Sequence, residues 1–209
     1  MDSLFNKNIK INTPKGLRII GLNHPAFFVA EVSANHEQEY EKALSIIHAS
    51  AEAGADAIKL QTYTPDSMTI DCDNDHFLVR SENSKNWNKK LFDLYKTAYT
   101  PREWHKPLKK ITENLGMVFF STPFDSNGVD FLTELNVEMF KVASYELTDI
   151  PLLKKIAQTG KPVILSVGFG TLNEITEAIN TLRKNGTKDI VILHCVTNYS
   201  KKPDIKNTN

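Results

Sequence analysis

The sequence predicts an α/β fold of the (β/α)8 type, a TIM barrel that is incomplete and has about six βα units. Short apolar runs alternate with longer helical patterns along the chain. Several of these runs are almost entirely apolar, as parallel strands buried on both faces must be. Polar residues follow at the carboxyl ends of most runs, and a barrel gathers such ends around one axis. A doubly wound sheet remains an alternative, because strand order is not visible in the sequence.

The chain is predicted to begin with a β-hairpin. Two short β-prone runs, Ile9–Ile11 and Leu17–Ile20, flank the turn signal Thr13-Pro14-Lys15-Gly16. The last residues carry no apolar periodicity. The predicted domains are therefore an N-terminal hairpin (1–26), a partial barrel (27–200) and a polar tail (201–209).

Six parallel strands are predicted within the barrel segment. They are Phe27–Val32, Ala57–Gln61, Met117–Ser121, Met139–Ala143, Pro162–Ser166 and Ile190–Cys195. Each connection between them is long enough for a right-handed crossover helix. A complete barrel typically has about 250 residues, and few residues follow Cys195, so we expect the seventh and eighth strands to be missing.

Helix start signals lie between the strands. Thr100-Pro101-Arg102-Glu103 combines a capping hydroxyl, a proline at the first helical position and a glutamate at the third. Thr171-Leu172-Asn173-Glu174 has the same reciprocal cap without the proline. Glu37–Ala53 carries a one-sided apolar stripe. Thr62–Gly116 is an oversized insertion with a helical stretch at Leu91–Ala98.

Composition and charge exclude several classes of protein. The chain has 209 residues, of which 41% are hydrophobic and 24% charged, which suits one folded domain and excludes disorder. Lys and Arg number 25, as do Asp and Glu, so no basic field exists to bind nucleic acid or an anionic membrane. No apolar run approaches the roughly 18 residues of a membrane span. The two cysteines lack the spacing of a zinc site or a disulfide framework, which favours a cytoplasmic protein.

Two lysines are predicted to point into the barrel. The period of two in a strand separates Lys59 and Gln61 from their apolar neighbours and isolates Lys141 in the same way. Two ammonium groups close to hydroxyls at strand ends form a pocket suited to phosphate and carboxylate groups. The hydroxyls in question belong to Thr122, Ser144 and Ser166.

The residue pattern leaves other interpretations open. Each lysine can instead pair with an inward acid, for which Glu31 and Glu146 are available, or act as the nucleophile of a Schiff-base aldolase. Glu31 is also a candidate base or a partner for a developing cation. The Gly168-Phe169-Gly170 stretch before a helix start allows backbone amides to approach an anion, with an ordinary tight turn as the alternative.

Seven stretches of the chain, in order, resemble the sialic acid synthase family, and most closely its pseudaminic acid synthase branch. They are FFVAEVSANHE, AGADAIKLQTYTPDSMTIDC, YTPREWH, FFSTPFD, FKVASYEL, TGKPVILSVG and ILHCVTNYS. The resemblance implies an enzyme of carbohydrate biosynthesis that condenses phosphoenolpyruvate with an acylated amino-sugar aldehyde. The product is a nonulosonic acid, a precursor of cell-surface glycans.

The resemblance also implies roles for individual residues. Phosphoenolpyruvate is expected to contact Lys59, Thr122, Lys141, Ser144, Ser166 and Thr197. The sugar is expected to contact Gln61, Glu146 and Tyr199. Glu31 is expected near the reacting centre, where a carboxylate orients the attacking water and stabilises oxocarbenium character. The expected catalytic residues are thus Glu31, Lys59 and Glu146.

The family further implies a divalent metal, Mn²⁺ or Mg²⁺, that polarises the aldehyde, and a homodimer. Its two metal-binding histidines and a small antifreeze-like domain come after the last strand present here, so we expect no metal ligand in this chain. We therefore expect a truncated chain with little or no synthase activity of its own. The alternatives are a non-catalytic remnant or half-barrel interaction protein, and a Schiff-base aldolase.

Overall fold

The computed structural model describes residues 8–79 and 89–195, which form two compact units. The described residues of the first unit are 8–12, 16–26 and 120–195. Those of the second unit are 13–15, 27–79 and 89–119. The sequence gives no indication of a boundary between Phe119 and Phe120, because the strand that contains both is buried throughout.

Six strands are hydrogen-bonded in the same order as they occur in the chain. They are β3 (Val29–Glu31), β4 (Ala57–Thr62), β7 (Val118–Pro123), β8 (Phe140–Val142), β9 (Val163–Ser166) and β10 (Ile190–Leu193). The pairs β3–β4, β7–β8, β8–β9 and β9–β10 are parallel. A doubly wound sheet would reverse its strand order at a switch point, so the observed order favours the barrel of the two predicted alternatives.

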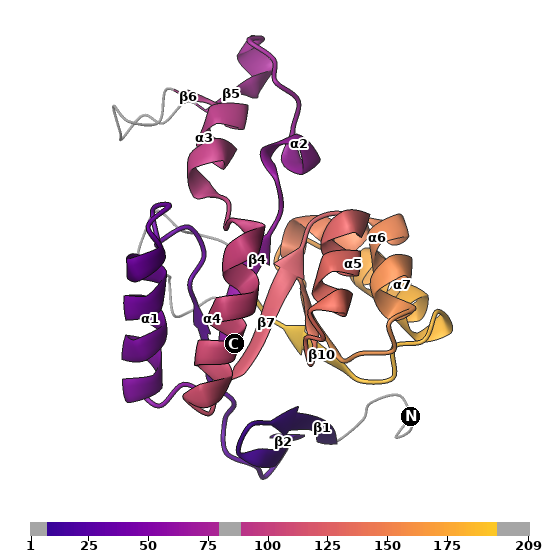
Figure 1. Cartoon of the computed structure of the whole chain (residues 1–209). Helices are drawn as coiled ribbons and strands as arrows, with labels where there is room; N and C mark the ends of the chain where they lie inside the picture. Colours follow the sequence, from indigo (N-terminus) through magenta and orange to yellow (C-terminus); the bar gives the residue numbers. More distant parts are fainter. Residues whose placement is uncertain (1–7, 80–88, 196–209) are drawn as a thin grey trace, which may run out of the picture. The chain divides into compact units, whose positions relative to one another are not determined.

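In the first unit, three helices alternate with the strands and cover one side of them (Figure 1). They are α5 (Ser126–Glu134), α6 (Ile150–Ala157) and α7 (Leu172–Lys184), and the 3₁₀ turn η2 (Ser144–Thr148) follows β8. The predicted reciprocal cap of α7 is confirmed: Glu174 N donates to Thr171 Oγ1, and Thr171 N donates to the Glu174 carboxylate. Buried Ala178 and Leu182 form its inner face.

The far end of α7 depends on a glycine. Gly186 has a φ of 127°, a left-handed conformation that side chains rarely adopt. A Cβ atom there would lie 2.7 Å from the carbonyl oxygen of Ala157, at the end of α6. Because that oxygen belongs to the backbone of a packed helix, it cannot move aside easily.

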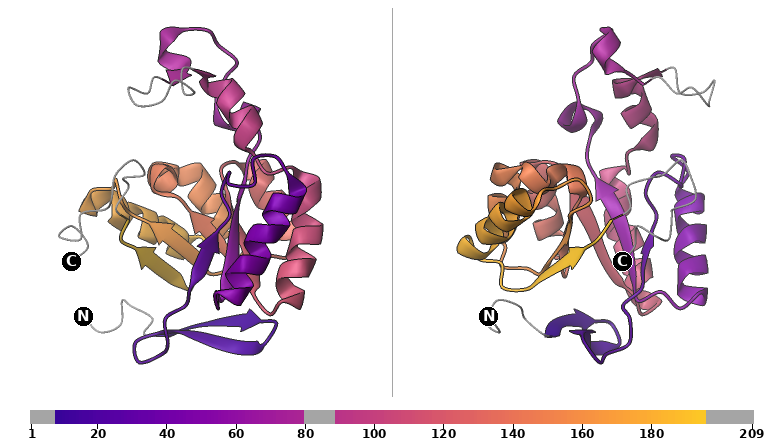
Figure 2. Two further views of the ribbon diagram at one scale, coloured as in Figure 1. Left: turned by 90° about the vertical axis from the view of Figure 1, so that its left-hand side faces the viewer. Right: turned by 180° about the vertical axis from the view of Figure 1, so that it is seen from behind.

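The N-terminal strands β1 (Asn8–Thr13) and β2 (Gly16–Gly21) form a two-stranded sheet of their own, where the sequence predicts a hairpin (Figure 2). Gly16 opens β2 with a φ of 108°, which a turn of this kind requires. No helix among residues 8–79 and 89–195 is long and apolar enough to cross a membrane.

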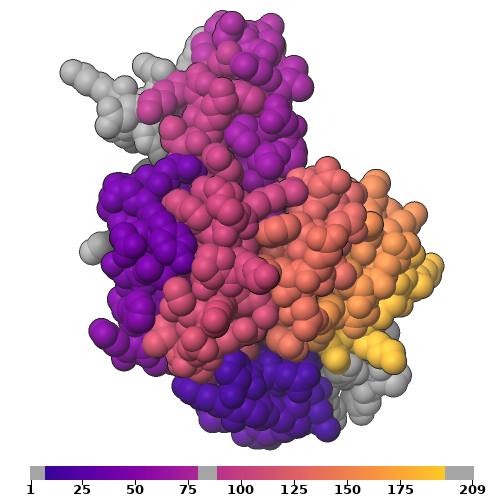
Figure 3. Space-filling view, viewed as in Figure 1, coloured from indigo at the N-terminus to yellow at the C-terminus, as the bar shows by residue number. Residues whose placement is uncertain are grey.

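In the second unit, α1 (Tyr40–Glu52) and α4 (Arg102–Asn114) pack side by side (Figure 3), and α4 also contacts β4. The predicted insertion follows β4. It contains α2 (Pro65–Met68), η1 (Asp75–Phe77), the antiparallel strands β5 (Leu78–Val79) and β6 (Lys89–Lys90), and α3 (Leu91–Ala98). The helix predicted at Leu91–Ala98 is confirmed at the same bounds.

Two predicted helix starts in this unit are wrong. The helix α1 begins at Tyr40 instead of Glu37, because Glu37 and Gln38 have φ values of 50° and 63° and lie in the left-handed region. At α4 the capping residue is Pro101, and the hydroxyl of Thr100 makes no cap. Thr100 Oγ1 lies instead 3.2 Å from Nε2 of the buried His36, a tertiary contact that local sequence does not reveal.

Candidate functional site

The predicted site residues fall into two groups, one in each unit. The first unit contains Thr122, Lys141, Ser144, Glu146 and Ser166. The second unit contains Glu31, Lys59 and Gln61. Thr197 and Tyr199 lie outside the described residues.

Lys141 is a buried ammonium group in β8, with an exposed fraction of 7%. Its Nζ donates to the carbonyl oxygen of Val142 at 2.7 Å and to Ser166 Oγ at 2.5 Å. Burial lowers the pKa of Lys141 to about 8, and the nearby side chains of Cys195 and Glu146 oppose this only in part. These two bonds use two of the three N–H groups of the amine, so the third can serve a ligand.

Ser166, at the end of β9, is oriented by two donors. Its Oγ accepts from Lys141 Nζ and also from Cys195 Sγ at 3.1 Å. A hydroxyl oxygen has two lone pairs and one hydrogen, so both acceptor positions are filled and the hydrogen is left to donate. Lys141 and Ser166 therefore present donors suited to an anion.

Cys195 is a member of this cluster that the sequence reasoning missed. The sequence did contain a signal for it. Side chains of an extended chain alternate between two faces, so Cys195 is expected on the same face as the predicted ligands Thr197 and Tyr199. A search for zinc or disulfide spacing does not detect a thiol that acts by donating a hydrogen bond to a serine.

Ser144 connects the loop after β8 to the loop after β9. Its Oγ accepts a hydrogen bond from Gly168 N at 3.1 Å, and Gly170 N donates to the carbonyl oxygen of Val167 at 3.3 Å. Both glycine amides are thus engaged inside the chain. The Gly168-Phe169-Gly170 stretch is an ordinary tight turn, which is the second of the two interpretations of its sequence.

Glu146 contributes a buried acceptor. Its Oε2 has no hydrogen-bond partner among the described residues. Burial raises the pKa of Glu146 above the ordinary value, against the hydrogen bond of its own backbone amide, and Asp149 adds to the increase. An unpaired buried carboxyl oxygen is unfavourable, so a ligand hydroxyl that reached Oε2 would relieve this cost.

In the second unit, Glu31 and Lys59 form an ion pair. They are direct neighbours in the parallel register of β3 and β4, which explains their contact. Glu31 Oε1 also accepts from the amide of Ser33 at 2.9 Å, and Ser33 Oγ lies 3.5 Å from Gln61 Oε1. For Lys59 the structure therefore has the inward acid that the sequence left open, whereas the described contacts of Lys141 are a carbonyl and a hydroxyl.

The ion pair predicts a coupled response to mutation. The exposed side-chain fractions are 13% for Lys59 and 38% for Glu31, so the pair is only partly shielded. We expect Lys59→Met alone to lower the free energy of unfolding by about 1 kcal/mol, because it leaves the carboxylate without its cation.

The double variant Glu31→Gln/Lys59→Met should recover part of this loss in urea unfolding. The control is Lys42→Met, which removes exposed pairs with Glu37 and Glu39 and should change stability by less than Lys59→Met does. Strictly additive effects of the two single substitutions would show that the pair is not coupled.

The residues that the structure describes do not fit a metal ion. Across 8–79 and 89–195, no three His, Cys, Asp or Glu side chains come close enough together to hold one. We therefore derive no chemical step through the divalent metal that the family resemblance implies.

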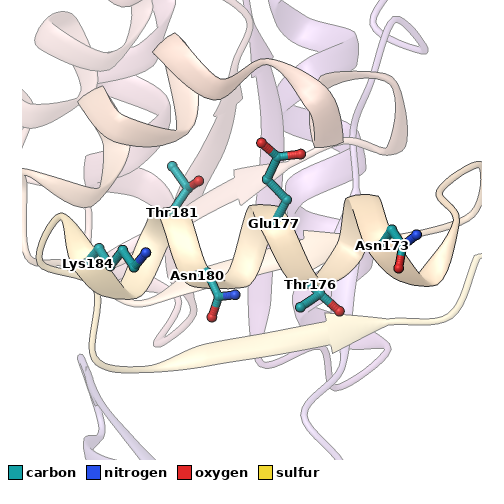
Figure 4. Close-up of a pocket in the computed structure, with 6 residues that line it drawn as sticks. All are labelled: Asn173, Thr176, Glu177, Asn180, Thr181 and Lys184. Carbon is teal, nitrogen blue, oxygen red and sulfur yellow. The ribbon is translucent and has the colours of Figure 1, made fainter.

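An open hollow of about 380 Å³ lies on the exposed face of α7 (Figure 4). It is lined by Asn173, Thr176, Glu177, Asn180, Thr181 and Lys184. These side chains stand on the opposite side of α7 from buried Ala178 and Leu182, and none of the predicted site residues lines the hollow. It is therefore not a candidate for the chemistry of the strand ends.

Comparison with known proteins gives a consistent picture. Residues 46–208 match the model of the NeuB family. The chain is 42% identical over 179 residues to pseudaminic acid synthase from Helicobacter pylori, covering 85% of this chain and 52% of that protein. It is 33% identical over 202 residues to N,N'-diacetyllegionaminic acid synthase from Legionella pneumophila, covering 93% of this chain and 54% of that protein.

Among solved structures, the chain is similar to an N-acetylneuraminic acid synthetase from Leptospira borgpetersenii, with 30% identity and a TM-score of 0.76. The match covers 93% of this chain and 62% of that one. This likeness and the observed strand order confirm the predicted fold class. The chain spans about half the length of the curated relatives it matches.

Proposed function

The chain belongs to the NeuB family, and from this premise we propose that the whole protein condenses phosphoenolpyruvate with an acylated amino-sugar aldehyde to form a nonulosonic acid. Two relatives, named as synthases of pseudaminic and diacetyllegionaminic acid, support the product class. In this reaction C3 of phosphoenolpyruvate bonds to the aldehyde carbon, water adds at C2, and phosphate leaves with cleavage of its C–O bond.

The donor cluster of Lys141 and Ser166 carries the proposal. Lys141 is a buried ammonium group with one N–H that makes no hydrogen bond to the part of the chain that the structure describes, and the hydroxyl hydrogen of Ser166 can also donate. These two donors suit the phosphate or carboxylate of phosphoenolpyruvate. Low polarity around the amine strengthens its attraction for such an anion. Binding of the anion would in turn favour the protonated amine.

Glu146 is proposed to bind the sugar substrate. A carboxyl group whose pKa is raised by burial can accept a hydrogen bond from a sugar hydroxyl or exchange a proton with it. The other assignments follow the motif match and remain predictions. They are Lys59, Thr122, Ser144 and Thr197 for phosphoenolpyruvate, Gln61 and Tyr199 for the sugar, and Glu31 for the attacking water.

The proposal is tested by titrating the 209-residue chain with phosphoenolpyruvate and, separately, with pyruvate in a calorimeter. Pyruvate has the carboxylate but lacks the phosphate, so we expect it to bind about tenfold or more weakly. Equal affinity for the two compounds, or no binding of either, would contradict the proposed anion site.

The thiol of Cys195 is expected to support this binding through Ser166. In Cys195→Ala the hydroxyl of Ser166 can turn its hydrogen away from the ligand, and we expect affinity for phosphoenolpyruvate to fall about three- to tenfold. Cys195→Ser, which still donates, should retain most of the affinity, and Cys72→Ala is the matched control. In a Ser166→Ala background, Cys195→Ala should have no further effect. An equal additional loss in that background would show that the thiol acts by another route.

The isolated chain is expected to show little or no turnover of phosphoenolpyruvate with N-acetylmannosamine and added Mn²⁺. The reason is that the described residues include no ligand set for the metal that the family implies. Measured release of phosphate by this chain would contradict the expectation while supporting the proposed reaction itself.

A Schiff-base aldolase is the second candidate, favoured by the lowered pKa of Lys141, since a neutral amine is the nucleophile in that chemistry. Borohydride reduction in the presence of pyruvate distinguishes the two. We expect no covalent adduct at pH 7, because the pKa of Lys141 is about 8, so most of the amine is protonated and an ammonium group has no lone pair to attack a carbonyl. A stable adduct on Lys141 would favour the aldolase.

A further inference from the structure

Two large aromatic rings stand exposed side by side in the first unit. Tyr145, in the turn after β8, is 76% exposed, and Phe169, in the loop after β9, is 51% exposed. Their ring centroids are 4.6 Å apart with 38° between the ring planes. Exposed apolar surface of this kind is unfavourable in water and often marks a binding surface.

The backbone on both sides of the rings is fixed. Gly168 N donates to Ser144 Oγ, which ties the residue before Phe169 to the residue before Tyr145. On the other side, Gly170 packs so closely on buried Leu147 that a Cβ atom would collide with its Cδ2. These contacts constrain the backbone that carries the two rings, which lowers the backbone entropy lost when a ligand binds.

The rings also stand at the chemically active end of their strands. Tyr145 directly follows Ser144, and Phe169 comes three residues after Ser166, whose Oγ accepts from Lys141. Carboxyl ends of parallel strands are where α/β proteins bind their ligands. The pair thus belongs to the same loops as the donor cluster, although the sequence analysis gave neither ring a role.

The chemistry of the rings selects between the two proposed substrates. The face of an aromatic ring carries partial negative charge and does not attract an anion such as phosphoenolpyruvate. It suits a neutral ligand that combines C–H surface with polar groups. Glu146, in the same turn as Tyr145, has a buried Oε2 without a hydrogen-bond partner among the described residues, and a shift of this side chain toward a ligand hydroxyl or amide would give that oxygen a partner. An acylated amino sugar has this combination of groups.

We propose that Tyr145 and Phe169 form a platform on which the acylated amino sugar stacks, so that the pair helps to select this substrate. The inference rests on the proposed function, from which the sugar class is taken. It names a binding surface additional to the residues predicted from motifs.

The test uses the full 209-residue chain with N-acetylmannosamine as the probe and mannose, which lacks the acyl group, as the comparison. Saturation-transfer NMR reports which sugar protons contact the protein, and its titration gives the dissociation constant. We expect Tyr145→Ala and Phe169→Ala each to raise that constant about three- to tenfold. Tyr145→Phe, which keeps the ring, should bind the sugar with the affinity of the wild type. Leu172→Ala is the matched control, because Leu172 is 82% exposed nearby and makes no ring contact that the structure records.

The possible outcomes separate this inference from the proposed function. Unchanged affinity in both alanine variants, or no binding of N-acetylmannosamine by the unmodified chain, overturns the platform. The rings could instead contact a second copy of the chain, and size-exclusion chromatography tests this. A dimer that Tyr145→Ala or Phe169→Ala dissociates would assign the rings to a dimer interface and overturn the platform. Ring-dependent sugar binding without any phosphoenolpyruvate binding supports the platform and contradicts the proposed reaction.

Discussion

Replacing Lys141 by methionine is expected to abolish phosphoenolpyruvate binding and at the same time to make the folded chain more stable at neutral pH. The affinity should fall at least about 100-fold, because the variant loses the buried cation on which the proposed anion site depends. Methionine fills a similar volume without a charge, so the core around β8 remains packed.

The expected gain in stability follows from the pKa of the amine. Folding lowers the pKa of Lys141 from 10.5 to about 8. Between these pH values the unfolded chain binds a proton that the folded chain does not, so the free energy of unfolding rises with pH by about 3 kcal/mol. At pH 7 the folded state bears this cost in full. Removing the charge recovers it, and subtracting about 1 kcal/mol for each of two lost hydrogen bonds leaves a gain of about 1 kcal/mol.

Urea unfolding of the wild type and Lys141→Met from pH 7 to 10.5, with calorimetry at pH 7, tests both parts. The stability of the wild type should approach and then pass that of the variant as the pH rises. Lys154→Met, at an exposed position of α6, is the control and should keep the pH dependence of the wild type. A less stable variant with an unchanged pH profile would show that Lys141 is not the buried cation described above.

Acid is expected to destabilise the chain through a buried histidine. His105, in α4, is fully buried, with Nδ1 3.1 Å from the carbonyl oxygen of Pro101 and Nε2 2.8 Å from Thr62 Oγ1. A carbonyl only accepts, so Nδ1 carries the hydrogen and Nε2 accepts from the threonine hydroxyl. Burial lowers the pKa of His105 to about 4. The ring is therefore neutral in the folded chain at pH 7.

The direction of the effect follows from linkage. Between pH 6.5 and 4 the unfolded chain protonates this ring and the folded chain does not, so about 3 kcal/mol of stability is lost as the pH falls through that range. Burial lowers the pKa of His36 as well, which adds to the loss.

Urea unfolding between pH 4 and 7.5 measures this loss. His105→Gln should be less stable at pH 7 but should lose less stability on acidification, while the exposed His48→Gln should follow the wild type. An unchanged acid profile in His105→Gln would assign the loss to other groups.

Much of the fold was predictable because it depends on local patterns. All six predicted strands are present within a few residues of their expected bounds, since apolar runs between turn residues have few other solutions in an α/β chain. The cap at Thr171 was also local, because its partner Glu174 is three residues away. In contrast, the predicted cap at Thr100 fails because a buried histidine from a distant segment takes the hydroxyl.

The site was predictable in its residue types and less so in its contacts. Alternation along a strand identified Lys59 and Lys141 as shielded amines, and both side chains are largely removed from solvent. It could not tell which of them has a carboxylate partner, because that depends on strand register, which places Glu31 opposite Lys59. Cys195 and the ring pair of Tyr145 and Phe169 depend on contacts between separate loops, which one sequence does not encode in any local motif.

Gly186 sets a limit on engineering of the connection between α7 and β10. Its left-handed backbone and the carbonyl oxygen of Ala157 together leave no room for a side chain. A loop graft or a shortened connection at this point would have to keep this one position as a fixed anchor and vary the residues that follow it. In libraries that randomise the whole connection, most members would lack this glycine and would place a strained side chain against the carbonyl oxygen of Ala157.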